Sequence, residues 1–377
     1  MLATFFDRWA YYGNVDNTTW GKFDFFLTPK CYLQSLTFVN SAGNAVVKVD
    51  NTTTILPAPL VNRDSIRLTS LDSYGLGSLI LIDVVHIPYG CSVWPAFWTY
   101  GIEETWPLAG EIDFIEAIND MTNNQVALHT TPGCFQAANP PQTGHTIETD
   151  CSKPQGCIVG ESKPNSFGQG FAQAGGGVYA LLMEPTGVSS WFWSRADIPA
   201  AIASATSSST MDISSWGLPT ASYSSSACNM TQFFPPQNLV LLTTLCGVWQ
   251  VGAGVPSIYS STCHTPTNNC VNDNVIGNGS NYANAYWEIR YIRTYLSDNA
   301  ASSTSSTSAI PSASTTPDAP APPSNPATTV VVVTEPAQPT TKQTIQSSST
   351  ARAFESSIVS GILSLFVTIL VATKVSF

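Results

Sequence analysis

The chain has few charged residues, and only a minority of those are basic. Charged side chains make up 10% of its 377 residues, with 14 Lys and Arg against 25 Asp and Glu, and the sequence pI is about 4.6. Nucleic-acid-binding proteins need a basic surface for the phosphate backbone. We therefore expect no nucleic-acid partner. The aromatic side chains, 11% of the chain with 10 Trp, favour a β-rich extracellular domain that handles neutral sugars.

Several motifs with well-defined chemistry are also missing. The sequence has no C-x-x-C pair and no Cys/His cluster with zinc spacing. It also lacks a G-x-S-x-G nucleophile motif, a phosphate-binding loop and a metalloprotease helix. A structural calcium ion has no recognisable set of ligands. We accordingly expect no metal and no other cofactor.

The cysteines predict disulfides rather than a metal site. There are nine of them, and an oxidising compartment would leave at least one unpaired or paired between chains. The pairing stays open at this stage. Four N-x-S/T sequons agree with a secretory route. The cysteines are Cys31, Cys91, Cys134, Cys151, Cys157, Cys228, Cys246, Cys263 and Cys270, and the sequons begin at Asn17, Asn51, Asn229 and Asn278.

The start of the chain does not fit that route. A secreted protein begins with a short apolar signal peptide, but Met1 to Phe6 are followed at once by Asp7 and Arg8. One interpretation is a cytosolic protein. We favour a truncated or misplaced start, because the other end resembles a secretory-pathway signal.

Two segments follow the folded part of the chain. Residues 299–357 are rich in Ser, Thr, Pro and Ala, so we expect a disordered stalk, which is often O-glycosylated. Residues 358–377 are mostly apolar, and the run Ile358 to Thr373 would span about 24 Å as a helix, short of a ~30 Å bilayer core. Small residues at Ser347 to Ser349 precede it, which is the order of a GPI-attachment signal. A retained membrane helix is the alternative. We expect an extracellular or cell-surface location, with membrane contact only through this tail.

Residues 1–298 predict one all-β domain. Long helical periodicity is absent, and short β-rich runs recur between Gly, Pro, Asn and Ser residues. This pattern indicates an antiparallel sandwich. The predicted strands are Asn44 to Val49, Ser65 to Thr69, Ser78 to Val85, Val93 to Thr99, Glu111 to Ile118, Gln125 to Thr130, Gly177 to Met183, Ser190 to Trp193, Val240 to Cys246 and Tyr286 to Tyr295.

The chemistry is concentrated in Gly110 to Ala117, which reads GEIDFIEA. Alternation along a strand puts Glu111 and Asp113 on one face and Glu116 on the other. A β-bulge that accommodates one extra residue near Phe114 or Ile115 would bring Glu116 back. An exposed acidic strand edge is the alternative, and the apolar neighbours disfavour it.

Three carboxylates on one face predict a split of their pKa values, because like charges in close proximity raise at least one of them. A retaining glycosidase needs one ionised carboxylate as nucleophile and one protonated carboxyl as acid, about 5–5.5 Å apart. Asp113, between Glu111 and Glu116, can hydrogen-bond one carboxyl and help set which partner holds the proton.

These residues resemble a known family. GEIDFIE, preceded by CSVWPAFW and followed by LHTTPGC, is similar to glycoside hydrolase family 16, and most of all to fungal endo-1,3(4)-β-glucanases, or laminarinases. The resemblance extends from about Phe5 to Tyr295. It implies a concanavalin-like β-jelly-roll with an open cleft on the concave sheet. The five-residue spacing from Glu111 to Glu116 resembles the bulged branch with laminarinases, whereas lichenases and fungal chitin–glucan transglycosylases have a four-residue spacing.

The resemblance also implies roles for single residues. Glu111 matches the nucleophile, Asp113 the assisting acid and Glu116 the general acid/base. His129, on the next predicted strand, matches a histidine beside the carboxylates; a structural histidine is the alternative. Sugar rings stack on indoles, and the candidates for this role are Trp94, Trp98, Trp106 and Trp249. Core packing is the alternative for each of them.

The implied activity is retaining, endo-acting hydrolysis of β-1,3-glucan or mixed β-1,3/1,4-glucan by a monomer. A cell-wall transglycosidase would use the same residues, and a catalytically silent glucan-binding protein would not need the acidic cluster. Two departures from the family stand out: Val248 replaces a common Asp, and Cys31 is unexpected. Cys31 is thus a candidate for the unpaired cysteine.

Overall fold

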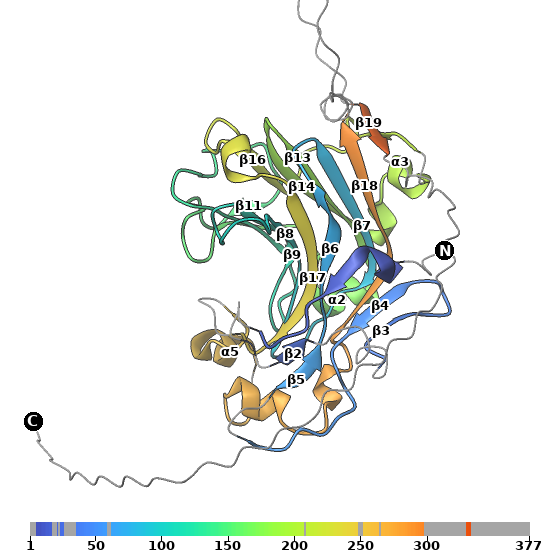
Figure 1. Cartoon of the computed structure of the whole chain (residues 1–377), viewed down its shortest axis with the longest axis vertical. Coiled ribbons are helices and arrows are strands. Elements are labelled where there is room, and N and C mark those ends of the chain that lie inside the picture. The colour runs from blue at the N-terminus through green and yellow to red at the C-terminus, as the bar shows by residue number, and fades with distance from the viewer. Residues whose placement is uncertain are drawn as a thin grey trace, which may run out of the picture. The chain divides into compact units, whose positions relative to one another are not determined.

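Strands form where β-branched and aromatic residues gather in short runs between turns. The computed structural model describes residues 5–16, 21, 23–25, 35–58, 62–206, 209–247, 252–263, 265–297 and 329–332. In this part of the chain two antiparallel sheets pack face to face (Figure 1). The predicted all-β sandwich is therefore confirmed.

The first sheet has eight strands. In spatial order they are β1 (Trp9–Tyr11), β6 (Arg67–Tyr74), β17 (Gln237–Leu245), β8 (Val93–Tyr100), β9 (Glu111–Glu116), β10 (Gln125–His129), β12 (Cys157–Gly160) and β11 (His145–Thr146). Two further strands, β2 (Phe23–Phe25) and β5 (Arg63–Ser65), form a separate parallel pair.

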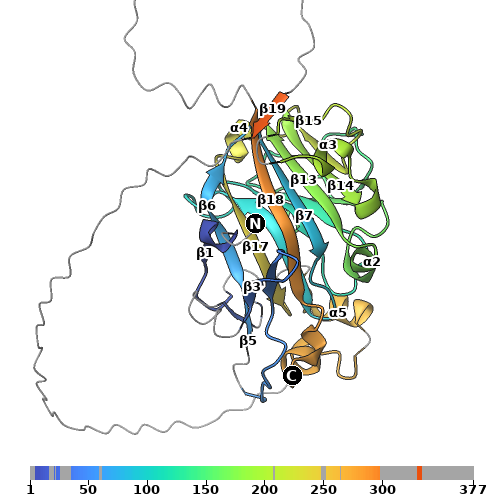
Figure 2. The same ribbon diagram turned by 90° about the vertical axis from the view of Figure 1, so that its right-hand side faces the viewer.

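The second sheet faces the viewer in Figure 2. Its order is β15 (Met211–Asp212), β19 (Thr329–Val332), β18 (Tyr286–Ser297), β7 (Ser78–His86), β13 (Gly177–Glu184), β14 (Gly187–Ser194) and β16 (Ala221–Ser224). In addition, β4 (Ala45–Lys48) pairs with β18, and β3 (Thr37–Val39) pairs with β4.

The helices are short and lie in the connections. They are α2 (Gly168–Gln173), α3 (Ala200–Ala203), α4 (Met230–Phe233) and α5 (Pro256–Thr262), with a π-helix at Val271–Val275 and 3-10 turns at Phe5–Arg8, Arg195–Asp197 and Ser280–Tyr282. Among the described residues, every helix is too short or too polar to cross a bilayer.

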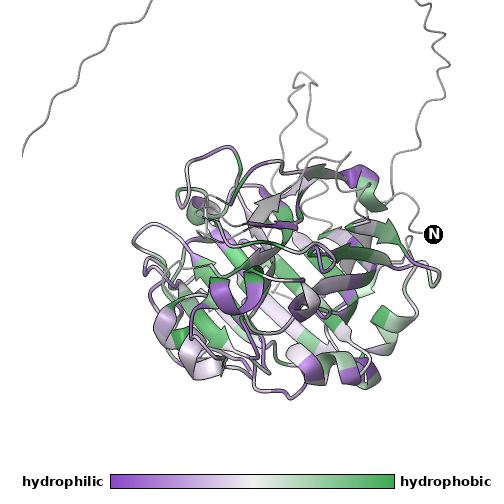
Figure 3. Cartoon of the chain, turned by 90° about the horizontal axis from the view of Figure 1, so that it is seen from below, coloured by the Kyte–Doolittle hydropathy of each residue, from purple (hydrophilic) through white to green (hydrophobic). Residues whose placement is uncertain are grey.

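The main core lies between the two sheets. Phe97, Phe114 and Leu239 enter it from the first sheet, and Ile80 and Tyr179 from the second, all almost fully buried. Figure 3 shows hydrophobic and hydrophilic stretches alternating along both the strands and the helices.

A second apolar cluster covers part of the opposite face of the first sheet. Trp98 and Val240 of the sheet pack there with Tyr259 and Tyr282 from the segment that follows β17. Strands β8 and β17 are thus buried on both faces, which explains the apolar runs Val93 to Trp98 and Leu239 to Leu242 within them.

All ten predicted strands coincide with or overlap strands of the two sheets. The sequence did not reveal the shortest strands, such as β1, β3 and β16, because three or four residues carry too little periodicity.

Four disulfides connect loops and strands: Cys91–Cys263, Cys134–Cys228, Cys151–Cys157 and Cys246–Cys270. The predicted disulfides are thus present. Cys31, the candidate for the unpaired cysteine, lies outside the described residues. Of the predicted stalk, the structure describes only β19, which pairs with β18 and β15. The tail 358–377 also lies outside the described residues.

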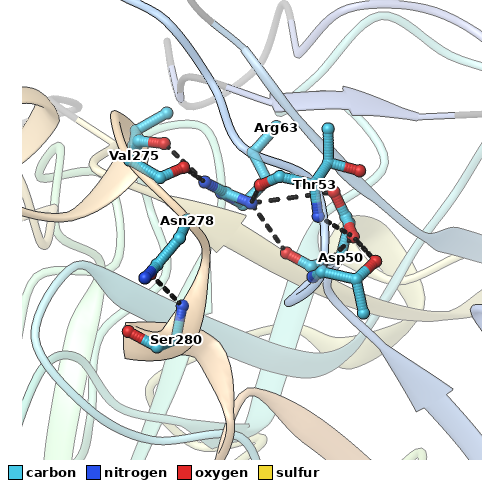
Figure 4. A network of polar contacts seen from close by, with 8 residues as sticks. Asp50, Thr53, Arg63, Val275, Asn278 and Ser280 are labelled. Atoms are coloured by element: carbon cyan, nitrogen blue, oxygen red, sulfur yellow. Dashed lines mark hydrogen bonds and ion pairs between the residues drawn. The ribbon is translucent and has the colours of Figure 1, made fainter.

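A buried arginine connects the segment after β4 to the segment before β18 (Figure 4). The guanidinium of Arg63 donates to the carbonyl oxygens of Thr53 at 2.9 Å and Val275 at 2.8 Å. It also lies 3.6 Å from the carboxylate of Asp50, and the Arg63 side chain is 0% exposed. The Arg63 side chain thereby bridges backbone oxygens from two distant parts of the chain.

Candidate active site

Strand β9 carries an irregularity in its middle. On β8, Trp98 lies opposite Asp113, while its neighbour Phe97 lies opposite Ile115. Phe114 is therefore an extra residue on β9, and both Phe114 and Ile115 are buried in the core. The β-bulge predicted at this place is confirmed.

The bulge decides where Glu116 points. Without it, Glu116 would face the core; with it, Glu116 lies opposite Ala96, on the same face as Asp113 and Trp98. Glu111, Asp113 and Glu116 thus lie together on the face of the first sheet that points away from the second sheet. The structure brings all three predicted carboxylates into one site.

Asp113 is the most deeply buried of the three, at 2% exposure. Burial raises the pKa of Asp113 well above its usual range, and the charges of Glu111 and Glu116 and a hydrogen bond with Glu111 raise it further. A protonated Asp113 can donate this hydrogen bond and so stabilise a negative charge on Glu111.

Glu116 has a mixed environment. Burial raises the pKa of Glu116, and the charge of Glu111 acts in the same direction. The indole N–H of Trp94, 2.8 Å from Oε1, and the charge of His129 lower the pKa in part, and the net shift is upward. A carboxyl of raised pKa in contact with a hydrogen-bond donor is suited to holding and releasing a proton.

Glu111 and His129 occupy the other end of the site. The indole N–H of Trp106 donates to Oε2 of Glu111. His129 lies opposite Glu111 on β10, with its Nε2 3.4 Å from Oδ2 of Asp113. Its ring centroid is 6.0 Å from that of Trp106, whose side chain is partly exposed. The structure thus places His129 and Trp106 beside the carboxylates.

The other tryptophans have different surroundings. Trp94 lies largely under the loop after β17, where a Cβ at Gly247 would come within 2.7 Å of its ring. Trp98 is 8% exposed and packs in the second apolar cluster. Trp249 and the divergent Val248 lie outside the described residues, so the structure does not place them.

Glycine is required immediately before Glu111. Gly110 has φ +66°, and a Cβ there would lie 2.5 Å from the carbonyl oxygen of Phe233. Any side chain would therefore displace the start of β9. This tight approach holds the start of β9, and with it Glu111, against the end of α4.

Two residues of the site had not been predicted. Asn124, just before β10, hydrogen-bonds the bulge and is 2% exposed. Arg67 on β6 lies over the rings of Tyr12, Trp98 and Tyr100 at 5.1 to 5.8 Å. No local motif marks either residue; only the strand order brings them to β8 and β9.

A divalent ion would find one set of ligand atoms in the site. Glu111, Asp113 and His129 each offer one such atom, and these atoms lie within 4.8 Å of one another. The acid–base chemistry of two carboxyl groups does not depend on such an ion.

A carboxyl group of raised pKa, here Glu116, on the same face as a second carboxyl group, here Glu111, is what acid catalysis at a glycosidic bond requires. The fold and the site therefore define the class of β-sandwich glycoside hydrolases. Comparison with family models gives the family: the XgeA-like catalytic domain of glycoside hydrolase family 16 matches residues 9–295. The chain belongs to this family.

Known relatives agree with the assignment. A probable glycosidase of Schizosaccharomyces pombe is 34% identical over 306 residues, which are 78% of this chain and 67% of that relative. A probable endo-1,3(4)-β-glucanase of Aspergillus fumigatus is 33% identical over 80% of this chain and 45% of its own length. The endo-1,3(4)-β-glucanase xgeA of Emericella nidulans is 37% identical over 62% of this chain and 36% of its own length. The chain thus spans less than half of the two glucanases.

Solved structures extend the likeness to three dimensions. Laminarinase 16A from Phanerochaete chrysosporium, in a complex with two β-glucans, matches with a TM-score of 0.72 and 32% identity. The match covers 78% of this chain and 96% of that structure. An elongating family 16 β-1,3-glucosyltransferase matches with a TM-score of 0.69 and 34% identity, over 76% of this chain and 95% of that structure.

Proposed function

We propose that the chain is a retaining, endo-acting glucanase that hydrolyses β-1,3-glucan or mixed β-1,3/1,4-glucan by double displacement. One observation carries the proposal: the bulge in β9 places Glu116, with its raised pKa, on the face that holds Glu111. The relatives named as endo-1,3(4)-β-glucanases support the substrate class.

The arrangement gives each residue a step. Glu111 attacks the anomeric carbon while Glu116 donates its proton to the leaving oxygen, and a glycosyl-enzyme with inverted configuration forms. Glu116 then removes a proton from water, which attacks the same carbon and restores the β configuration. Asp113 stabilises the charge of Glu111 before the attack. Trp106 positions Glu111, and its partly exposed ring can contact a sugar.

Product analysis on defined glucans tests this function. We expect reducing sugar from laminarin, with a ladder of oligosaccharides rather than glucose alone. Proton NMR during the reaction should show the β-anomer first. A product that appears first as the α-anomer would contradict double displacement, and cleavage of neither laminarin nor lichenan would contradict the proposed substrate class.

Glycosyl transfer is the second candidate, because a family 16 β-1,3-glucosyltransferase is among the similar structures. Transfer would use Glu111 and Glu116 in the same way, with a sugar hydroxyl in place of water in the second step. Incubation of the protein with laminarioligosaccharides separates the two. Products longer than the substrate indicate transfer, and shorter products alone indicate hydrolysis.

We further propose that the protein passes through the secretory pathway and acts outside the cell. The four disulfides support this, since such bonds persist in oxidising compartments. The apolar tail supports GPI attachment. When the full chain is expressed, we expect the tail to be exchanged for the anchor and the protein to be released from host membranes by a phosphatidylinositol-specific phospholipase; retention after treatment would contradict the anchor.

A further inference from the structure

A pocket lies on the outer face of β3, β4 and β18. These strands belong to the second sheet, whereas the carboxylates lie on the first. The volume of the pocket is about 290 Å³. Phe38, Val46 and Glu288 lie side by side across these three strands, and Lys48 and Tyr286 form the next row. All five line the pocket.

The lining combines an aromatic surface with fixed polar groups. The side chain of Phe38 is 40% exposed, so its ring is accessible. Oε1 of Glu288 accepts hydrogen bonds from Asn40 at 2.8 Å and Asn44 at 2.7 Å, which hold the carboxylate in place. Lys48 contributes donors. An aromatic face beside fixed donors and acceptors is suited to one pyranose ring, which has an apolar C–H face and a rim of hydroxyls.

Asn51 lines the same pocket and begins the sequon Asn51-Thr52-Thr53. Its Oδ1 is buried and has no hydrogen-bond partner among the described residues. The other two described sequons differ. The Oδ1 atoms of Asn229 and Asn278 accept hydrogen bonds from Thr231 at 2.8 Å and Ser280 at 3.0 Å, and neither residue lines this pocket.

We propose that Asn51 carries an N-linked glycan and that its first N-acetylglucosamine occupies this pocket. In the modification, Nδ2 of Asn51 loses a proton and bonds to the anomeric carbon of the sugar, whose bond to a lipid-linked pyrophosphate breaks. The attached sugar then packs against Phe38 and hydrogen-bonds to Glu288 and Lys48. The proposal rests on the secretory route and is independent of the proposed catalytic activity.

The site of attachment is tested on the full chain expressed in yeast behind a signal peptide, and the protein is recovered from the medium or released from the membranes. We expect mass spectrometry of the peptide with Asn51 to show the glycan, and to show Asp at this position after removal by peptide N-glycosidase. An unmodified Asn51 peptide in the protein that has passed through the secretory pathway would overturn the proposal.

The role of the pocket is tested by comparing glycan lengths. Endoglycosidase H leaves a single N-acetylglucosamine on the asparagine, so the Tm should stay that of the untrimmed protein. Asn51→Gln removes the sugar completely, and we expect a Tm lower by roughly 2–4 °C. Asn229→Gln is the matched control, because that residue is exposed and outside the pocket, and its Tm should stay unchanged.

Phe38→Ala tests whether the attached sugar contacts the pocket. It should lower the Tm more in the glycosylated protein than in the Asn51→Gln background, because only the first has a sugar to lose contact with. Equal effects in both backgrounds would overturn the proposal. So would Phe38-dependent binding of laminarioligosaccharide to the unglycosylated protein, since the pocket would then be a site for free glucan.

Discussion

The carboxamide of Asn124 fills the gap that the bulge leaves beside Glu116. Its Oδ1 accepts the backbone N–H of Glu116 at 2.9 Å, and its Nδ2 donates to the carbonyl of Phe114 at 2.9 Å. The side chain thus replaces a peptide unit of the missing ladder. Its own backbone is held by Ser166 at 3.0 Å and Glu161 at 2.9 Å. Asn124 therefore positions Glu116 without contacting substrate.

Substitution of Asn124 should impair turnover in a pH-dependent way. Asn124→Leu loses both hydrogen bonds, and we expect kcat to fall roughly 10²-fold, the cost of a misplaced catalytic group. Asn124→Asp keeps the shape of the side chain. When protonated, its carboxyl can donate to Phe114 and accept from Glu116 as the amide does; when ionised, it repels the Phe114 carbonyl.

The ratio of kcat between Asn124→Asp and the native protein should therefore rise as the pH falls, while the ratio for Asn124→Leu stays flat. Thermal melts at each pH exclude unfolding as the cause. A flat ratio for both variants would show that Asn124 contributes only to stability. A crystal structure of Asn124→Leu gives an independent check, since Glu116 should lose its contact with Trp94.

Trp94 should control the basic limb of the pH profile. Its N–H lowers the pKa of Glu116, so Trp94→Phe should raise that pKa. The acid catalyst must be protonated, and activity is lost as the pH rises through this pKa. The basic limb of kcat/KM should then move to higher pH. Trp98→Phe makes the same chemical change on the same strand, away from Glu116, and should leave the limb in place; a shift with both variants would argue against the hydrogen bond as the cause.

Azide can distinguish the roles of Glu111 and Glu116. Glu111→Ala should retain glucan binding and lose turnover. Azide can enter the space of the lost carboxylate and attack from the same side, so we expect an α-glucosyl azide from an activated substrate. With Glu116→Ala, azide replaces water in the second step and should give the β-glucosyl azide. The opposite pair of products would exchange the two roles.

The sequence was sufficient to predict what depends on local pattern. Strand positions follow from short apolar runs, and the bulge follows from the five-residue spacing of Glu111 and Glu116 on a strand whose intervening residues, apart from Asp113, are apolar. The contacts that complete the site depend on which distant segments become neighbours. Trp94 was a candidate for stacking against a sugar ring. Its ring lies largely under Gly247, and its N–H donates to Glu116.

The role of Asn124 could not be predicted from the sequence either. Asparagine before a strand is common in turns, and nothing in its neighbours indicates that it completes the bulge. That role requires the register between β9 and β10, which places Gln125 opposite Glu116. Register is set by the whole sheet and so is not readable from one segment.

Gly110 should tolerate no side chain. Gly110→Ala places a Cβ 2.5 Å from the Phe233 carbonyl at a φ of +66°, and strain of this kind costs roughly 1–3 kcal/mol. We expect a lower Tm together with a lower kcat, because Glu111 is the next residue. Gly43→Ala is the matched control: its φ is +82° but no atom lies within 4 Å of the added Cβ. Native kcat in Gly110→Ala would show that β9 adjusts without moving Glu111.

Arg63 should contribute to stability and not to turnover. Arg63→Met leaves the carboxylate of Asp50, itself 3% exposed, without its cation, and removing one partner of a buried pair costs roughly 3–5 kcal/mol. Arg63→Lys keeps the charge but cannot reach both Thr53 and Val275. Its denaturation midpoint should therefore lie between those of the native protein and Arg63→Met. Arg8→Met breaks the exposed pair with Asp72 and should cost about 0–1 kcal/mol. Urea denaturation of the three variants measures these differences, and equal midpoints for Arg63→Met and Arg8→Met would show that the buried network does not connect the two segments energetically.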